Sequence, residues 1–187
     1  MNILLLDTET VAMASGSRYP AMCQIGMIRG TIHMNELDVT VLGELDQKLN
    51  PEVPASEWQE DAIAITGIRP EDVANEPTFF EAYHDIYDMA CGSRILVGYN
   101  VEFDVNVIAA ALRRYGLEHH FPWPREHVDV MKLSADRFPA IAGKRGNKYP
   151  TLSEAYAKLM GEELKDAHDA MADIRATLEV YRKCIST

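Results

Sequence analysis

Two acidic residues stand two positions apart at the end of the first apolar run of this chain. Asp7 and Glu9 follow the aliphatic stretch of residues 3–6. Because residues i and i+2 of a strand point to the same face, both carboxylates are predicted to project together. Like charges held so close resist ionising together, and a divalent cation would resolve that conflict. The alternative is two solvated acids at a polar strand end, which is common for so short a motif.

A third carboxylate and a histidine–aspartate pair lie far downstream. Asp104 closes the segment GYNVEFD, in the first turn of a predicted helix, where the helix dipole favours an acid whatever its function. His168 and Asp173 are five residues apart near the C-terminus. Five residues turn an ideal helix through about 500°, so these side chains converge only if His168 lies at or before the helix start. Otherwise, His168 is a surface histidine at a helix end.

Taken together, these segments suggest metal-assisted hydrolysis of a phosphodiester. Four carboxylates can hold two divalent ions such as Mg²⁺ or Mn²⁺, which clamp the attacking and leaving oxygens. A histidine can accept a proton from the attacking water near neutral pH. The four acids are candidate metal ligands and, with the histidine, candidate catalytic residues: Asp7, Glu9, Asp104, Asp173 and His168.

The order of predicted elements is three strands, then helices that alternate with short apolar runs. Strands or short apolar runs are expected at 3–6, 22–28, 37–45, 94–97 and 128–131, the first three as an antiparallel meander. Helices are expected near 56–65, 77–91, 101–115, 151–160 and 171–185, with Ser56, Asn100 and Thr151 as N-caps. This order predicts an α/β fold with a mixed sheet in a single domain, residues 1–187.

Composition limits the class of protein. Hydrophobic residues make up 47% and charged residues 25% of the 187 residues, as in soluble globular proteins. No apolar run approaches the ~18 residues of a membrane span, so no membrane partner is expected. Three scattered cysteines without a CxxC pair, and Asp7 too near the start for a signal peptide, favour a cytoplasmic setting. A net charge of −11 counts against a protein that coats nucleic acid, but not against an enzyme that grips a strand end.

The motif set resembles the DnaQ-like 3′→5′ exonucleases of the DEDDh subgroup, over essentially the whole chain. The matching motifs are Asp7-x-Glu9, the segment that ends at Asp104, and His168-x-x-x-x-Asp173. This resemblance, which includes the polymerase III epsilon proofreading domain and stand-alone exonucleases, implies a ribonuclease H-like fold with a central mixed five-stranded sheet flanked by helices. It also implies two bound Mg²⁺ or Mn²⁺ ions, His168 as general base, and release of nucleoside 5′-monophosphates from a 3′ end. The leading hypothesis is that this end belongs to single-stranded DNA.

The same resemblance implies substrate contacts. Thr10 and three residues of the segment 61–66 would border the 3′-terminal nucleotide: Asp61, Ile65 and Thr66. Two positions depart from the family pattern, because Thr66 stands where epsilon-type proofreaders commonly carry histidine, and Tyr99 stands where many members have histidine. Both departures leave the acid set intact and bear on substrate preference.

Alternatives stay open at this stage. The same chemistry could act on RNA, as in ribonuclease T or oligoribonuclease, or the chain could be a catalytically silent binding module, which would not need all five residues. A basic loop with Lys144, Arg145 and Lys148 is expected either to contact phosphate or to offset an acidic surface. The end at Thr187 favours a free-standing nuclease over a subunit with a polymerase-binding tail, while a polymerase partner and a homodimer both stay open.

Overall fold

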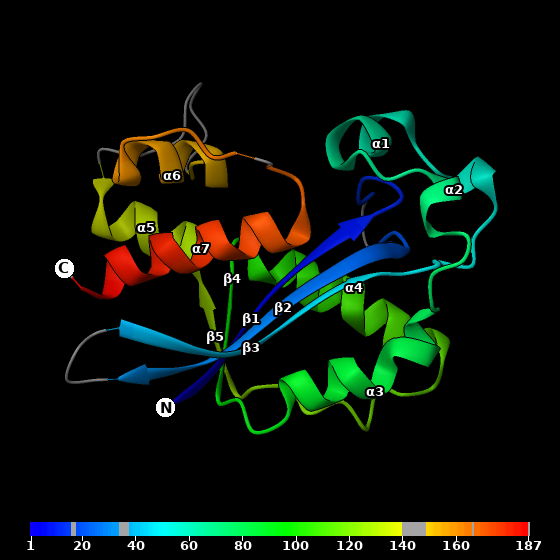
Figure 1. Cartoon of the computed structure of the whole chain (residues 1–187), viewed down its shortest axis with the longest axis horizontal. Coiled ribbons are helices and arrows are strands. Elements are labelled where there is room, and N and C mark those ends of the chain that lie inside the picture. Colours follow the sequence, from blue (N-terminus) through cyan, green and yellow to red (C-terminus); the bar gives the residue numbers. More distant parts are fainter. Residues whose placement is uncertain (16–17, 34–37, 140–148, 166, 187) are drawn as a thin grey trace.

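A mixed five-stranded sheet in the order β3-β2-β1-β4-β5 forms the centre of the molecule (Figure 1). The structure is a computed structural model that describes the chain except residues 16–17, 34–37, 140–148, 166 and 187. The first three strands form the predicted antiparallel meander, and the last two run parallel to β1. The strands are β1 (Asn2–Thr10), β2 (Met22–His33), β3 (Asp38–Lys48), β4 (Ile95–Gly98) and β5 (Glu126–Asp129).

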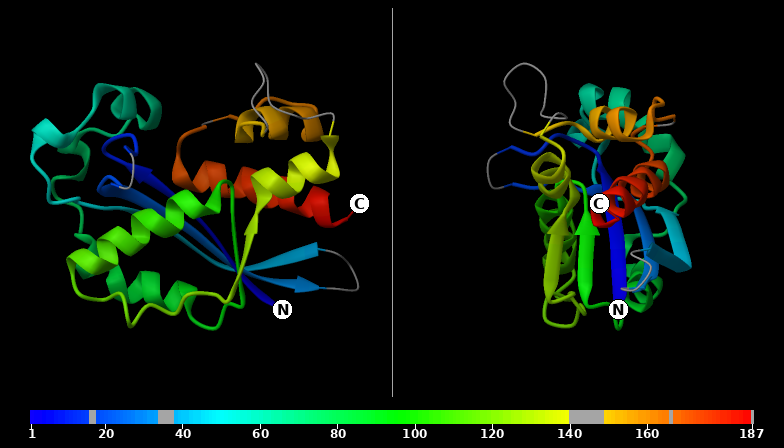
Figure 2. Two further views of the ribbon diagram at one scale, coloured as in Figure 1. Left: turned by 180° about the vertical axis from the view of Figure 1, so that it is seen from behind. Right: turned by 90° about the vertical axis from the view of Figure 1, so that its left-hand side faces the viewer.

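Helices cover both faces of the sheet (Figures 1 and 2). One face carries α3 (Phe79–Ala90) and α4 (Val101–Arg114). The other carries α5 (Val130–Arg137), α6 (Leu152–Met160) and α7 (Ala170–Ile185). The short helices α1 (Glu60–Thr66) and α2 (Pro70–Val73) lie off the C-terminal end of β1 (Figure 1). Among the described residues, no helix is both long and apolar enough to cross a membrane.

Alternation along β1 explains its continuous aliphatic run. Leu4 and Leu6 pack in the core under α3 and α4, whereas Ile3 and Leu5 pack in the core under α7. The strand is therefore buried on both faces, as its aliphatic run predicts. Since side chains alternate, the row of Ile3 and Leu5 continues into Asp7 and Glu9 on the α7 face. The other row continues into Thr8 on the α4 face.

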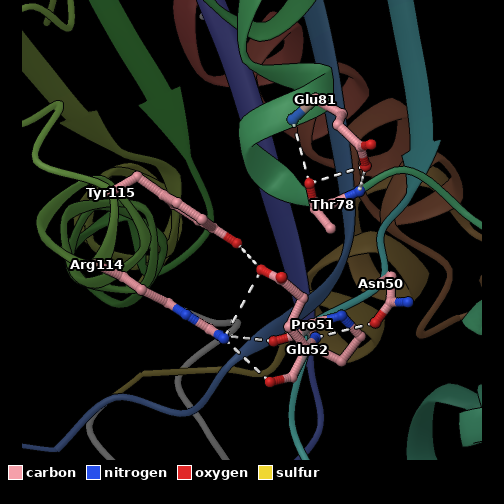
Figure 3. A network of polar contacts seen from close by, with 7 residues as sticks. All are labelled: Asn50, Pro51, Glu52, Thr78, Glu81, Arg114 and Tyr115. Atoms are coloured by element: carbon pink, nitrogen blue, oxygen red, sulfur yellow. Dashed lines mark hydrogen bonds and ion pairs between the residues drawn. The ribbon is translucent and has the colours of Figure 1, made fainter.

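The far end of α4 is tied to the segment after β3 (Figure 3). The guanidinium of Arg114 donates to the carbonyl of Pro51 at 2.7 Å and to that of Glu52 at 3.0 Å. The hydroxyl of Tyr115 donates to the carboxylate of Glu52. These bonds fix the C-terminal end of the helix whose N-terminal turn carries Asp104.

Two predicted caps are wrong, and one is confirmed. Residues 55–57 form a 3₁₀ turn, and the helix begins only at Glu60 after Gln59, so Ser56 caps nothing there. Asn100 occupies the N-cap position of α4, but its φ of 62° is left-handed and its side chain makes no capping bond. Thr151 does cap α6, and the reciprocal bond from Glu154 completes the capping box. At Ser56 the predicted helix start is wrong, whereas at Asn100 the start is right and only the side-chain capping bond is missing.

Candidate active site

Carboxylates from both ends of the chain converge at the C-terminal end of β1. Oxygen atoms of Asp7, Glu9 and Asp173 all lie within 4.8 Å of one another. Asp7 and Glu9 project together, as the strand spacing predicts, and they meet the first turn of α7, which carries Asp173. This is the one group of possible metal-ligating side chains found in the described part of the chain.

Asp104 adjoins this trio from the opposite helix layer. Its side chain is 2% exposed, and its Oδ1 accepts hydrogen bonds from the backbone nitrogen of Thr8 at 2.9 Å and from the Thr8 hydroxyl at 2.8 Å. Thr8 lies between Asp7 and Glu9, so the strand that carries two acids also holds the third. Asp104 is not part of the 4.8 Å group, but its charge acts on that group.

Burial and mutual repulsion raise the pKa values of the clustered acids. Burial raises the pKa of Asp7 well above its usual value, and the Asp104 charge is the next largest cause. Burial likewise raises the pKa of Glu9 to about 8, followed by the charge of Asp173. Burial raises the pKa of Asp104 to about 7 although the Thr8 bonds oppose this shift. The four acids therefore favour a state in which cations or protons offset their charges.

His168 lies just outside the last helix. Because α7 begins at Ala170, His168 precedes the helix start. This position is the one that allows His168 and Asp173, five residues apart, to lie on the same side. Its φ of 73° is left-handed, and its backbone nitrogen donates to Oδ2 of Asp173 at 3.3 Å. Burial raises the pKa of Asp173, and this bond from His168 is the largest opposing cause. The residue is exposed to solvent.

The side chains present fit divalent metal ions. Oδ1 of Asp173 is buried and has no hydrogen-bond partner among the described residues. In Asp104, both bonds from Thr8 end on Oδ1, which leaves Oδ2 available to another ligand. All candidate donors are carboxylate oxygens, the hard ligands that Mg²⁺ and Mn²⁺ prefer.

A family model described as Exonuclease matches residues 4–181 of the chain. The chain belongs to this exonuclease family. RNA exonuclease 4 of Saccharomyces cerevisiae is 24% identical over 181 residues, which cover 96% of this chain and 53% of that protein. DNA polymerase III subunit epsilon of Haemophilus influenzae is 26% identical over 181 residues, which cover 95% of this chain and 65% of that protein. This family member thus spans only about half to two thirds of these relatives' lengths.

Solved structures confirm the predicted ribonuclease H-like fold. Exonuclease I of E. coli, in complex with a dT13 oligonucleotide, superposes with a TM-score of 0.69 at 23% identity, covering 97% of this chain and 40% of that one. The nuclease domain of 3′hExo, a DEDDh family member bound to rAMP, gives 0.75 at 13% identity, with 99% and 92% covered. At identities of 23% and 13%, these structures show that the chain shares their fold and nothing further.

Two threonines expected at the substrate have local partners. The hydroxyl of Thr10, at the end of β1, donates to the carbonyl of Ala12 at 2.9 Å. The hydroxyl of Thr66 accepts a bond from the backbone nitrogen of Ile68 at 3.1 Å, in the turn after α1. Neither belongs to the acid cluster, so their contact with a nucleotide stays a prediction.

Asp61 and Ile65, also expected at the substrate, are exposed on α1. The segment before α1 is tied to the chain that leaves β1, because the backbone nitrogen of Gln59 donates to the carbonyl of Val11 at 2.9 Å. This bond keeps α1 at the end of the sheet where the acids lie (Figure 1). A role for these two side chains in substrate binding stays a prediction.

Tyr99 has a structural role in this family member. Its hydroxyl donates to the carbonyl of Pro150 at 2.8 Å, and its ring packs against the core under α7. The bond ties the start of α6 to the end of β4. Lys144, Arg145 and Lys148, predicted to contact phosphate, lie outside the described residues.

Several residues that organise the site were not singled out from the sequence. Thr8 holds Asp104, Asp169 caps α7 by accepting from the backbone nitrogen of Ala172 at 3.0 Å, and Gln24 in turn contacts Asp169. An aspartate directly before an apolar helical stripe is a typical N-cap signal, so Asp169 could have been found from the sequence. The partner of Asp169 on β2 is not visible in any local pattern.

Proposed function

We propose that this chain is a metal-dependent 3′→5′ exonuclease that releases nucleoside 5′-monophosphates from the 3′ ends of single-stranded DNA. The observation that carries the proposal is the convergence of Asp7, Glu9 and Asp173 within 4.8 Å in a member of the exonuclease family. Asp104, buried beside them, supplies the fourth carboxylate.

In this proposal, the four acids hold two divalent ions. Bound Mg²⁺ or Mn²⁺ would neutralise charge on the phosphodiester and orient its attacking and leaving oxygens. The chain's own contribution is position: β1 directs two acids to one face, Thr8 fixes Asp104, and the first turn of α7 presents Asp173. Such preorganisation lowers the entropic cost of bringing reacting groups together.

His168 is proposed as the general base. Its exposed ring, held outside α7 by the left-handed turn, would accept the proton of the attacking water. The water oxygen then bonds to phosphorus, while the bond from phosphorus to the 3′ oxygen of the preceding nucleotide breaks and that oxygen takes up a proton from solvent to become the new 3′-hydroxyl. The terminal nucleotide leaves as a 5′-monophosphate.

Single-stranded DNA is the first substrate candidate, and RNA is the second. The epsilon relative is a subunit of a DNA polymerase, and exonuclease I was solved with an oligodeoxynucleotide. The yeast relative is named as an RNA exonuclease, and 3′hExo was solved with rAMP. Discrimination would depend on contacts with the 2′-hydroxyl.

The test uses 5′-labelled single-stranded DNA and matched RNA, with Mg²⁺ or Mn²⁺, with and without chelator, and with Asp104→Ala in parallel. We expect a chelator-sensitive ladder that shortens from the 3′ end and is absent in the variant. The faster substrate decides between DNA and RNA. Absence of cleavage at high enzyme concentration would overturn the proposal and favour a silent binding module.

A further inference from the structure

We infer that Gln24 of β2 is a positioning residue for the proposed active site. Its side-chain amide holds Asp169, the N-cap of α7, which lies between His168 before the helix and Asp173 in its first turn. The inference rests on the proposed function and adds a residue that lies outside its metal ligands and its base.

Gln24 joins the helix cap to the sheet. It is 2% exposed, and its Nε2 donates to Oδ2 of Asp169 at 3.2 Å and to Oδ1 of Asp46 at 2.9 Å. Asp169 uses its other oxygen to cap α7, where Oδ1 accepts from the backbone nitrogen of Ala172 at 3.0 Å. One carboxylate therefore closes the helix and anchors it to β2 at the same time.

Gly26 lets the same turn lie directly against β2. A Cβ at this position would be 2.8 Å from Cδ1 of Ile174 and 3.1 Å from the carbonyl carbon and oxygen of Ala170. A side chain would push the helix start away from the strand. Gln24 and Gly26 are two residues apart and so face the same side, one supplying a hydrogen bond and the other supplying room.

The pairing of β1 with β2 places this anchor beside the acids. Gln24 is paired with Glu9, and Gly26 is paired with Asp7. The strand next to the acid-bearing one thus receives the helix that carries Asp173. A shift of α7 along β2 would change the distance from Asp173 to the acids of β1.

The anchored turn moves His168 and Asp173 as a unit. The backbone nitrogen of Asp173 donates to the carbonyl of Asp169 at 2.9 Å, and the backbone nitrogen of His168 donates to the carboxylate of Asp173. Within the part of the chain that the structure describes, the bond from Gln24 is the one hydrogen bond that joins residues 167–173 to the sheet. Its loss would leave the internal bonds of the turn intact but free the turn to shift.

The test compares Gln24→Leu with Asp46→Ala, which removes the other acceptor of the same amide but leaves the bond to Asp169. We expect Gln24→Leu to lower kcat roughly 10- to 100-fold, as misplacement by about 1 Å does, with an unchanged KM. Asp46→Ala should keep the wild-type kcat.

Amide hydrogen exchange gives a readout that does not depend on activity. Peptides covering residues 167–175 should lose protection in Gln24→Leu and keep it in Asp46→Ala. Equal kcat in wild type and a folded Gln24→Leu variant, or equal loss in both single variants, would overturn the inference. If wild type itself is inactive, the proposed function fails, and the exchange data alone decide whether Gln24 anchors α7.

Discussion

Asp104 and Asp173 reach the same site from opposite faces of the sheet, and the chain holds them in different ways. Asp104 is buried and accepts two hydrogen bonds, at 2.8 and 2.9 Å, from Thr8. Asp173 is partly buried, accepts one bond at 3.3 Å from the backbone of His168, and keeps one oxygen without a partner. Thr8 therefore holds one oxygen of Asp104 with two bonds, whereas Asp173 has a single, longer bond and a buried oxygen without a partner among the described residues.

The starts of the two helices that carry these acids, α4 and α7, are also held in different ways. Both start after a non-glycine residue in the left-handed region, Asn100 before α4 and His168 before the cap of α7. The backbone nitrogen of Asn100 donates to the carboxylate of Asp129 at 3.1 Å, and the far end of α4 is tied by Arg114. The start of α7 depends on the amide of Gln24. The body of α7 is also tied to the sheet, because Arg182 donates to the carbonyl of Val39 at 2.6 Å. We therefore expect the start of α7, rather than the whole helix, to respond to ligands.

The largest expected effect comes from Asp104→Asn. The variant keeps an oxygen that can accept the Thr8 bonds, but it loses the charge that the proposed metal site needs. We expect turnover to fall at least roughly 10³-fold, the upper range for loss of one electrostatic contact in an active site. Stability in chelator should not fall, because a buried charge is removed. The measurement is single-turnover cleavage with thermal melting, and wild-type turnover would contradict the site assignment.

His168→Gln should have the next largest effect. We expect a loss near the lower end of the range for general acid–base catalysis, about 10²-fold in rate. The backbone bond from residue 168 to Asp173 survives, so Mn²⁺ affinity should be retained. Calorimetric titration with Mn²⁺, run beside the rate measurement, separates the two roles. A variant that no longer binds Mn²⁺ would identify His168 as a ligand or as part of its support.

The rise of Tm on adding Mn²⁺ tests whether Oδ1 of Asp173 binds a metal ion. A ligand at 100 times its Kd stabilises the folded state by about 2.7 kcal/mol, which raises Tm by roughly 5–10 °C in a chain of this size. Adding Mn²⁺ should produce such a shift in wild type and a much smaller one in Asp173→Asn. Asp136→Asn, an exposed acid on α5, is the matched control. Equal shifts in all three proteins would place the ion elsewhere.

The smallest effect is expected from Thr8→Val, which removes the hydroxyl bond to Asp104 but keeps the backbone bond. One such bond contributes about 1 kcal/mol to the free energy of unfolding, and chemical denaturation in chelator would detect that loss. Thr8→Ser retains the hydroxyl and should lie closer to wild type. If Thr8→Val is as stable as wild type, Asp104 is held by other contacts.

Local rules predicted the elements and the acid set because they depend on periodicity along the chain. Asp7 and Glu9 share a face because side chains alternate along any strand, and Thr151 caps α6 through residues three positions apart. The same kind of rule failed at Ser56 and Asn100. At Asn100 the backbone is left-handed rather than extended as in a typical N-cap, and its nitrogen donates to Asp129, which is 29 residues away in sequence.

The sequence by itself determined which side chains could do the chemistry, and its motifs were sufficient to suggest the family. Only the tertiary structure decided that the cap of α7 is anchored to β2, because the bond from Gln24 to Asp169 spans 145 positions and leaves no local signal. It also decided that Asp104 is held by Thr8, across 96 positions. Contacts between distant segments depend on how the sheet and helices pack, and spacing along one segment carries no information about them.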